Sequence, residues 1–254
     1  GRQSANPLNK LGFAIARKNY DKIIITPLGK KFLEDEYDIS YIFLKSLIKI
    51  QFPNPWSTSF AKEKGFNINP FISTLHLLNE INKKSDTHGL TQSEFAVFVP
   101  TLNKFDGIDD QIKKIQKYRK QTNKKLFIEN FAKKFFNKEK LDKKKINDLY
   151  DYGDNIMRYF RLTNYFKVSK SHLLGEWRLD LDPIKKEEIN QIINKFNGKP
   201  LSFTNEDEYI KYLSDINQPV LPWENKDNLL KIINSYKKII LKTLKENKIK
   251  IENF

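Results

Sequence analysis

The spacing of apolar residues changes at position 164, and this change predicts a helix followed at once by a hairpin. Before that position, apolar residues recur every three or four positions, as on one face of a helix: Leu149, Ile156, Tyr159 and Phe160. After Asn164, two alternating runs, Tyr165–Val168 and Glu176–Leu181, flank a polar loop at Ser169–Gly175. This order is typical of the second half of a winged helix, in which the helix enters the major groove of DNA and the hairpin rests on the backbone.

Arginine is concentrated in the same segment. Of the 46 basic residues, only six are arginines, and three of them lie here: Arg158, Arg161 and Arg178. Arginine reads guanine through two parallel hydrogen bonds, so these positions favour sequence-specific DNA contact. The alternative is a structural helix and hairpin whose charges are merely solvated.

The N-terminal pattern predicts another hairpin and a series of helices. Leu11–Phe13 and Lys22–Ile25 flank a polar tip, and Thr26-Pro27 is a helix start with Leu28, Phe32 and Leu33 inside. A helix over about Ser40–Phe52 is halted by prolines, and Trp56 anchors the loop that follows. The next helix begins at Asn69-Pro70, with an apolar side formed by Phe71, Leu75 and Leu78.

The middle of the chain resembles a second helix-turn-helix. A helix runs from Gln92 to about Leu102 after the cap Thr91, and Ile108–Gln121 forms the next helix after a turn. Ile108, Ile112 and Ile115 are expected inside that second helix. The basic residues are expected outside: Lys113, Lys114, Lys117, Arg119 and Lys120. This helix either contacts DNA or is a solvated surface helix, and its charge pattern fits both. A basic helix over 124–145 follows, with Phe127, Phe131, Phe135 and Phe136 as its buried stripe.

The fold class expected from these patterns is mainly α with small β-hairpins, arranged as tandem winged-helix subdomains. Residues 1–84 form the first subdomain, 85–146 a basic helical one and 147–200 the third. Residues 201–254 hold a short helix at Asn205–Ile216, a linker, and a terminal helix at Asn225–Lys248. The residues expected inside that helix are Leu229, Ile232, Ile233, Ile239, Ile240 and Leu244. The chain starts at Gly1 without a methionine, so we expect a fragment whose first subdomain is truncated.

Composition narrows the choice of partner. The net charge is +15, and residues 101–150 carry 15 Lys/Arg against 7 Asp/Glu, a local +8. Such a field usually binds the phosphate backbone; a membrane surface is the competitor, but no helix pairs a basic face with a clean apolar one. The absence of cysteine excludes disulfides and cysteine-ligated zinc. An intracellular protein without a membrane span or signal peptide is expected.

Short blocks of residues occur along the chain in a defined order: Pro7–Phe13 with Ile25–Lys30, Phe43–Leu47 with Gln51–Pro53, Ile68–Phe71, Gly89–Thr91, and Arg158–Thr163 with Leu179–Pro183. Their order and spacing resemble the DNA-recognition part of the AlwI-like type IIS restriction endonucleases, a family that includes site-specific nicking enzymes. The resemblance covers most of residues 1–240, and the block at Arg158–Thr163 is the closest.

The resemblance implies winged-helix recognition subdomains similar to those of FokI-type enzymes, which read a short asymmetric site on double-stranded DNA. It implies a monomer in the prokaryotic cytoplasm. In the family a linker and a separate, Mg²⁺-dependent nuclease domain follow. The sequence departs from the family there, because it stops before that domain. The nuclease domain, or a separate nuclease subunit, is therefore an expected partner.

The chain itself is expected to be non-catalytic, with no metal and no cofactor. A two-metal nuclease needs an Asp, then a Glu and a Lys one residue apart on the next strand. Asp215 with Glu224 and Lys226 comes closest, but Asp215 ends a predicted helix and the other two precede one. Glu246 and Lys248 have no partner Asp on a strand. The histidines, His76, His88 and His172, lack metal-ligand spacing.

Two sets of DNA-binding residues follow from these patterns. The expected base readers are Asn155, Arg158 and Arg161, with Arg2, Gln3 and Asn6 as a second set if Gly1–Lys10 ends a recognition helix. The expected backbone contacts are Lys113, Lys117, Lys120, Lys167, Lys170 and Arg178. The rival interpretation is a winged-helix regulator or replication-initiator fragment unrelated to a nuclease. A regulator usually reads a palindrome as a dimer, so the symmetry of the site separates the two.

Overall fold

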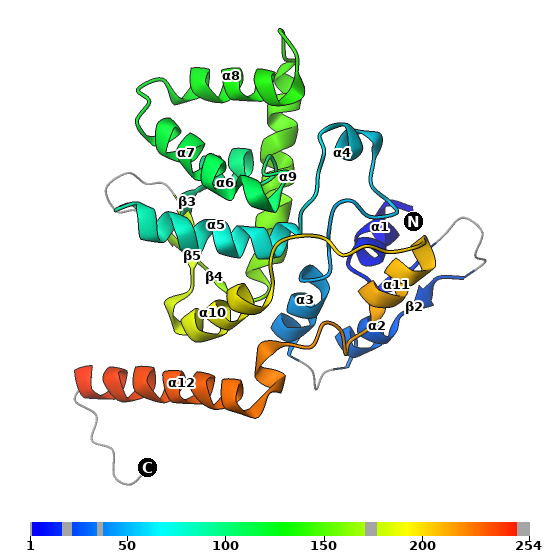
Figure 1. The fold of residues 1–254 in the computed structure, drawn as a ribbon, viewed down its shortest axis with the longest axis vertical. Coiled ribbons are helices and arrows are strands. Elements are labelled where there is room, and N and C mark those ends of the chain that lie inside the picture. The colour runs from blue at the N-terminus through cyan, green and yellow to red at the C-terminus, as the bar shows by residue number, and fades with distance from the viewer. Residues whose placement is uncertain (1, 17–21, 35–37, 171–176, 248–254) are drawn as a thin grey trace.

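The computed structural model describes residues 2–16, 22–34, 38–170 and 177–247, and this part of the chain is mainly helical (Figure 1). The α-helices are α1 (Arg2–Lys10), α2 (Pro27–Phe32), α3 (Ile39–Leu47), α4 (Ser59–Glu63), α5 (Pro70–Lys84), α6 (Gln92–Phe98), α7 (Ile108–Arg119), α8 (Lys124–Phe136), α9 (Lys143–Arg161), α10 (Lys186–Lys195), α11 (Glu206–Ser214) and α12 (Lys226–Glu246). The strands are β1 (Ala14–Ile15), β2 (Ile24–Ile25), β3 (Leu90–Thr91), β4 (Phe166–Lys170) and β5 (Trp177–Leu181). The expectation of a mainly helical chain with small antiparallel sheets is confirmed.

The first hairpin is present, but its first strand begins later than predicted. Ala14 pairs with Ile25 and Ile15 with Ile24, whereas Leu11–Phe13 form a buried turn before the strand. The predicted tip lies outside the described residues. Thr26 caps α2 as expected: its hydroxyl accepts from the Gly29 N–H at 2.9 Å and donates to the Gly12 carbonyl at 2.6 Å. Leu33, expected inside, is exposed because it follows the last turn of α2.

The next elements build one side of the core. Helix α3 ends at Leu47, earlier than predicted. Trp56 anchors its loop as expected, with its indole N–H donating to Glu206 at 2.8 Å and its ring against Tyr209. Asn69 caps α5, and Pro70 occupies its first turn. The predicted apolar side of α5 is fully buried: Phe71, Leu75 and Leu78.

The second sheet joins segments that the sequence assigned to different subdomains. Its strand order is β3-β5-β4, with Leu90 opposite Leu179 and Val168 opposite Leu179 on the other side. Helix α6 also packs on α9, where a side chain at Gly153 would meet Ala96 at 2.4 Å. The boundary predicted between residues 146 and 147 therefore falls inside one packed unit, because strand pairing across that boundary outweighs the change in composition.

Helices α7 and α8 follow the predicted pattern in part. Ile108, Ile112 and Ile115 are buried, as expected. The basic run predicted over 124–145 is divided, because Asn137 adopts a left-handed conformation (φ 54°) that ends α8 before Asp142 caps α9. Figure 1 shows α9 crossing the stack of α5 to α8.

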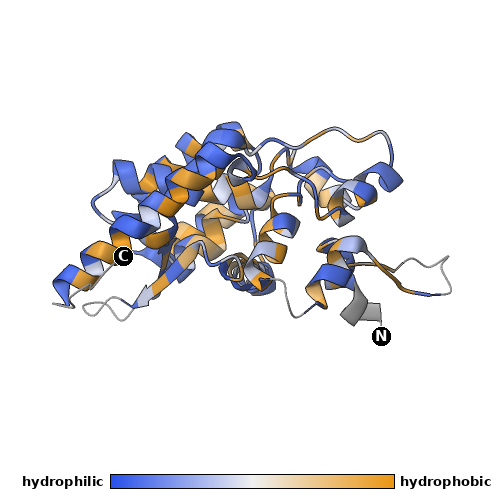
Figure 2. Cartoon of the chain, turned by 90° about the horizontal axis from the view of Figure 1, so that it is seen from below, coloured by the Kyte–Doolittle hydropathy of each residue, from blue (hydrophilic) through white to orange (hydrophobic). Residues whose placement is uncertain are grey.

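The terminal helix α12 is less buried than its pattern suggested. Asn225, expected as the first residue of the helix, is its cap, and α12 packs against α10 and residues 222–224. Ile232 is buried and Ile239 and Leu244 are half-buried, whereas Leu229, Ile233 and Ile240 are exposed. Helix α12 extends away from the rest of the described chain (Figure 1), and Figure 2 shows hydrophobic and hydrophilic residues alternating along the helices.

Among the described residues, no helix combines the length and apolar character needed to cross a bilayer.

Candidate nucleic-acid interface

Helix α9 has one buried face and one solvent face, and the predicted base readers lie on the solvent side. Leu149, Gly153 and Phe160 face the core, where Phe160 contacts Phe71 and α6 covers the glycine. The exposed residues include all three expected base readers of this helix: Asn155, Arg158 and Arg161. Steps of three residues turn a helix by only about 60°, so these three side chains can enter one groove.

Arg158 has a neighbour that the sequence analysis did not single out. Its guanidinium lies 2.6 Å from an Asp154 carboxylate oxygen, one turn earlier on α9, while the arginine side chain remains 73% exposed. The four-residue spacing of Asp and Arg on a helix is the signal that could have indicated this pair.

The hairpin formed by β4 and β5 begins directly after α9 and presents basic and aromatic residues. Lys167 and Lys170 are exposed on β4, as a backbone-contacting role requires. Lys170 pairs with Trp177 across the strands, and its ammonium lies 5.9 Å from the centroid of the indole, which is 53% exposed. Trp177 was not among the residues predicted from the sequence; an exposed tryptophan beside a lysine offers a ring that can stack on nucleic acid. His172 lies outside the described residues.

Arg178 does not occupy the position expected of a backbone contact. Its guanidinium is mostly buried, donates to the carbonyls of His88 (3.1 Å) and Gly89 (3.3 Å), and lies 3.7 Å from Glu94. We therefore correct its expected role: the side chain joins β5 to the segment before β3, because the buried carboxylate attracts it inward.

Arg119 is also directed inward, although the helical pattern placed it outside. It donates to Glu94 through Nε at 2.8 Å and through Nη2 at 3.1 Å. Its remaining donors reach Ser85 and the carbonyls of Thr87 and Gly89. Glu94 also accepts from the backbone N–H of Thr91, which completes a capping box on α6. This Arg119–Glu94–Arg178 cluster joins α6, α7, β5 and residues 85–89.

The lysines of α7 are exposed as predicted, on a helix that packs against α5, α6 and α8. Lys113, Lys117 and Lys120 all reach solvent, and Lys113 makes only a loose pair with Asp110, at 3.4 Å. They come from a helix separate from α9, and both helices pack on α6. A positive surface of this kind attracts the negatively charged DNA backbone.

The second predicted set of base readers lies on α1, which directly precedes the first hairpin. Asn6 is exposed there. Arg2 and Gln3 belong to the same helix, but their side chains lie outside the described part. The helix–strand–strand order of α1, β1 and β2 repeats the order of α9, β4 and β5.

Comparison with known proteins decides between a nuclease and a regulator. Residues 9–254 match the family model described as AlwI restriction endonuclease.

The chain belongs to the AlwI restriction endonuclease family.

Membership of the AlwI family makes DNA the substrate class. The match spans nearly the whole chain, so it gives no support to the expectation that the catalytic part lies entirely elsewhere. No curated protein matches the chain.

The carboxylates that come closest to a nuclease motif in this AlwI-family chain have structural partners. Asp215 ends α11, and its side chain accepts from the backbone N–H of Asn217 at 2.8 Å. Glu224 accepts from the backbone N–H of Leu221 at 2.8 Å and pairs with Lys45 at 3.0 Å. Within the described ranges, no three His, Asp or Glu side chains are grouped closely enough to hold a metal ion.

Two buried lysines, Lys45 on α3 and Lys49 in the turn that follows it, were not singled out in the sequence analysis. Lys45 donates to the Pro219 carbonyl at 2.8 Å, and Lys49 donates to the Asp215 carbonyl at 2.6 Å. Burial lowers the pKa of Lys49 to about 7; the charge of Lys45 acts in the same direction, and Asp215 opposes it. Both lysines hold the connector between α11 and α12 against α3. No periodicity signals them, because they sit on the apolar side of an otherwise apolar helix.

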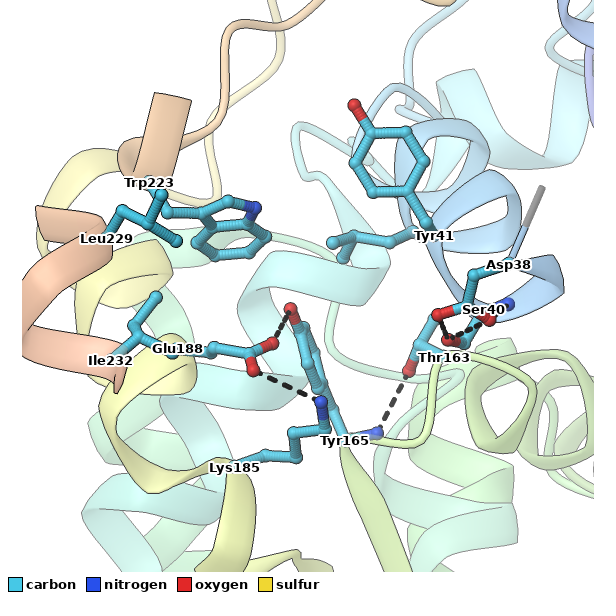
Figure 3. A pocket seen from close by; sticks show the side chains of 11 residues that line it. Asp38, Ser40, Tyr41, Thr163, Tyr165, Lys185, Glu188, Trp223, Leu229 and Ile232 are labelled. Atoms are coloured by element: carbon cyan, nitrogen blue, oxygen red, sulfur yellow. Dashed lines mark hydrogen bonds and ion pairs between the residues drawn. The ribbon is translucent and has the colours of Figure 1, made fainter. Parts of the chain in front are cut away.

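A cavity of about 260 Å³ lies where α3, the end of α9, α10 and α12 meet (Figure 3). Glu188 accepts hydrogen bonds there from Tyr165 (2.8 Å), Lys185 (3.1 Å) and Tyr236. Burial raises the pKa of the Tyr165 hydroxyl well above its ordinary value, so this hydroxyl remains a donor. The polar groups of the cavity thus bind one another and attach α12 to the body.

Proposed function

We propose that this chain is the DNA-recognition region of an AlwI-family restriction or nicking endonuclease, and that α9 reads bases in the major groove. The observation that carries the proposal is the topology of residues 70–181. Helix α5, strand β3, helix α6, helix α9 and the β4–β5 hairpin follow in that order, with sheet order β3-β5-β4. We interpret this order as that of a winged helix whose second and third helices are separated by an insertion, α7 and α8.

The solvent face of α9 supports the choice of reading helix. Its arginines can each bind guanine and Asn155 can bind adenine through two hydrogen bonds. Lysines on α7 and β4 would neutralise phosphates and fix the register: Lys113, Lys117, Lys120, Lys167 and Lys170. Trp177 would pack on the backbone beside Lys170. Arg2, Gln3 and Asn6 on α1 would form a second reading set, because α1 also precedes a hairpin.

The proposal assigns cutting to a Mg²⁺-dependent nuclease domain or subunit of the parent protein, with this region binding as a monomer. Incubation of the chain with Mg²⁺ and supercoiled plasmid should leave the plasmid intact. Nicking that disappears in an Asp215→Ala or Glu224→Ala variant would place the chemistry in this chain and refute this part of the proposal.

Duplex binding is expected to be steeply salt-dependent. Neutralising about 6–10 phosphates gives a slope of log affinity against log salt near −5 to −9. Fluorescence anisotropy of a labelled duplex between 50 and 200 mM salt, roughly the range over which such contacts weaken strongly, measures the slope.

The lysines of α7 supply the matched test of that slope. The Lys117→Ala/Lys120→Ala double variant should bind all duplexes more weakly, with a slope shallower by about two. Lys211→Ala provides the control, because Lys211 is exposed on α11, a helix that carries none of the proposed DNA contacts. A nearly flat salt dependence of the unaltered chain would contradict the proposed backbone contacts.

A further inference from the structure

We infer that Asp154 is a positioning residue, which holds the Arg158 guanidinium in the orientation that reads a base pair. The inference rests on the proposed function of α9. It adds a specificity-determining residue that makes no base contact of its own.

Asp154 and Arg158 form an ion pair on α9. The two side chains are four residues apart on α9, with the acidic residue nearer the N-terminus, which is the favourable order for a helical ion pair. The 2.6 Å separation joins one Nη nitrogen to one carboxylate oxygen. The contact is an ion pair, and the guanidinium side chain stays 73% exposed, so its N–H donors remain accessible to a base while the carboxylate restricts its position.

The Asp154 carboxylate lies on the helix that is proposed to bind DNA. A negative charge on a surface that binds phosphates weakens binding through repulsion, so Asp154 opposes affinity wherever it stands on this face. Its contribution must therefore be to orientation. A free arginine samples many rotamers, and fixing it before binding lowers the ordering cost of the base contact.

A comparison within the chain shows what an unselective surface pair looks like. Lys113 and Asp110 on α7 are 3.4 Å apart, and both side chains are about three-quarters exposed. Asp154 is 37% exposed and Arg158 is 73% exposed, so the acid lies closer to the body of the protein than the arginine does. A less exposed acid beside a more exposed arginine is the arrangement expected of a residue that positions a base-reading side chain.

The inference predicts opposite changes in affinity and selectivity. In Asp154→Asn, binding to unrelated duplexes should strengthen, because a repulsive charge is removed. Discrimination at the base pair read by Arg158 should fall by about two- to fivefold, the range of an exposed ion pair. Arg158→Ala should lose the full contact, about 5- to 150-fold. Asp154→Glu should restore discrimination, since glutamate also reaches an arginine four residues on.

The experiment is competition binding with the duplex that the unaltered chain prefers and with its single-base-pair variants. Asp151→Asn is the matched control, because Asp151 is exposed three residues earlier on α9. It should strengthen binding to every duplex equally. Circular dichroism confirms that each variant retains its helices.

The outcomes separate the inference from the function on which it rests. If Arg158→Ala loses discrimination at one position while Asp154→Asn behaves like Asp151→Asn, the positioning role is refuted and the reading role of α9 stands. If none of Arg158→Ala, Arg161→Ala and Asp154→Asn changes discrimination at any position, α9 does not read DNA and the proposed function fails as well.

Discussion

Replacing Glu94 with alanine is expected to lower the free energy of unfolding by about 3–5 kcal/mol, the cost of removing one partner from a buried ion pair. The carboxylate is almost fully buried, and it caps α6 while binding Arg119 and lying near Arg178. Its loss would leave two mostly buried guanidinium groups without their counter-charge. Because domains are stable by only about 5–15 kcal/mol, this single change should remove a large part of the stability.

Urea unfolding followed by circular dichroism measures the effect. The unfolding midpoint of Glu94→Gln should lie between those of the unaltered chain and of Glu94→Ala. The amide keeps an acceptor for the capping interaction but lacks the charge. Asp110→Ala is the matched control, because the Asp110–Lys113 pair is exposed, and it should leave the midpoint unchanged. Equal midpoints for Glu94→Ala and Asp110→Ala would show that the buried cluster contributes nothing to stability.

The stability of the chain is expected to rise with pH above neutrality, through Lys49. Burial lowers its folded-state pKa from 10.5 to about 7, so between these values the unfolded chain binds more protons than the folded chain. Stability therefore increases as pH rises through this window, and the destabilisation is complete below pH 7. From about pH 7 to about pH 9 the gain is on the order of 2 kcal/mol.

Denaturant unfolding at several pH values tests this dependence. Lys49→Met should remove the rise over the same window, because methionine fills the site without titrating. Lys211→Met, at an exposed position on α11, should retain the rise in stability with pH. An unchanged pH profile in Lys49→Met would mean that Lys49 keeps its proton in the folded chain.

Local signals in the sequence predicted the helix starts well. Four residues were predicted as the cap or the first residue of a helix: Thr26, Asn69, Thr91 and Asn225. The side chain of each accepts a hydrogen bond from a backbone N–H of the first turn. The succession of α9 and its hairpin was also predictable, because the apolar spacing changes there from a helical to a strand period. Each of these features depends on residues within a few positions of one another.

Features that depend on distant residues could not be predicted. Arg119 and Arg178 are directed inward by Glu94, which is 25 residues from the first and 84 from the second in sequence. Lys45 and Lys49 bind backbone carbonyls more than 160 residues away. The strand β3 is only two residues long, and its partner β5 follows four intervening α-helices. Helix α12 has the apolar stripe that the sequence predicted, but only Ile232 of that stripe is buried, because burial depends on what packs against the helix.

The exposure of the candidate site residues was predicted from the sequence, whereas several contacts of the core were not. Asn155, Arg158, Arg161 and the lysines are exposed, as contact with DNA requires, because solvent-facing positions follow from helical and strand period alone. Trp177 and Asp154 were missed. Predicting the role of Trp177 requires the register of the hairpin. Predicting that of Asp154 requires its ion pair with Arg158, which only the four-residue spacing indicates.

Selection of preferred duplexes from a random DNA pool tests most directly whether α9 reads sequence. The unaltered chain should yield one asymmetric motif. Arg158→Ala and Arg161→Ala should each lose preference at defined positions, about 1–3 kcal/mol of discrimination per contact, while keeping non-specific binding. Lys113→Ala and Lys117→Ala should select the same motif with lower affinity. A palindromic motif from the unaltered chain, or an unchanged motif from both arginine variants, would contradict the account.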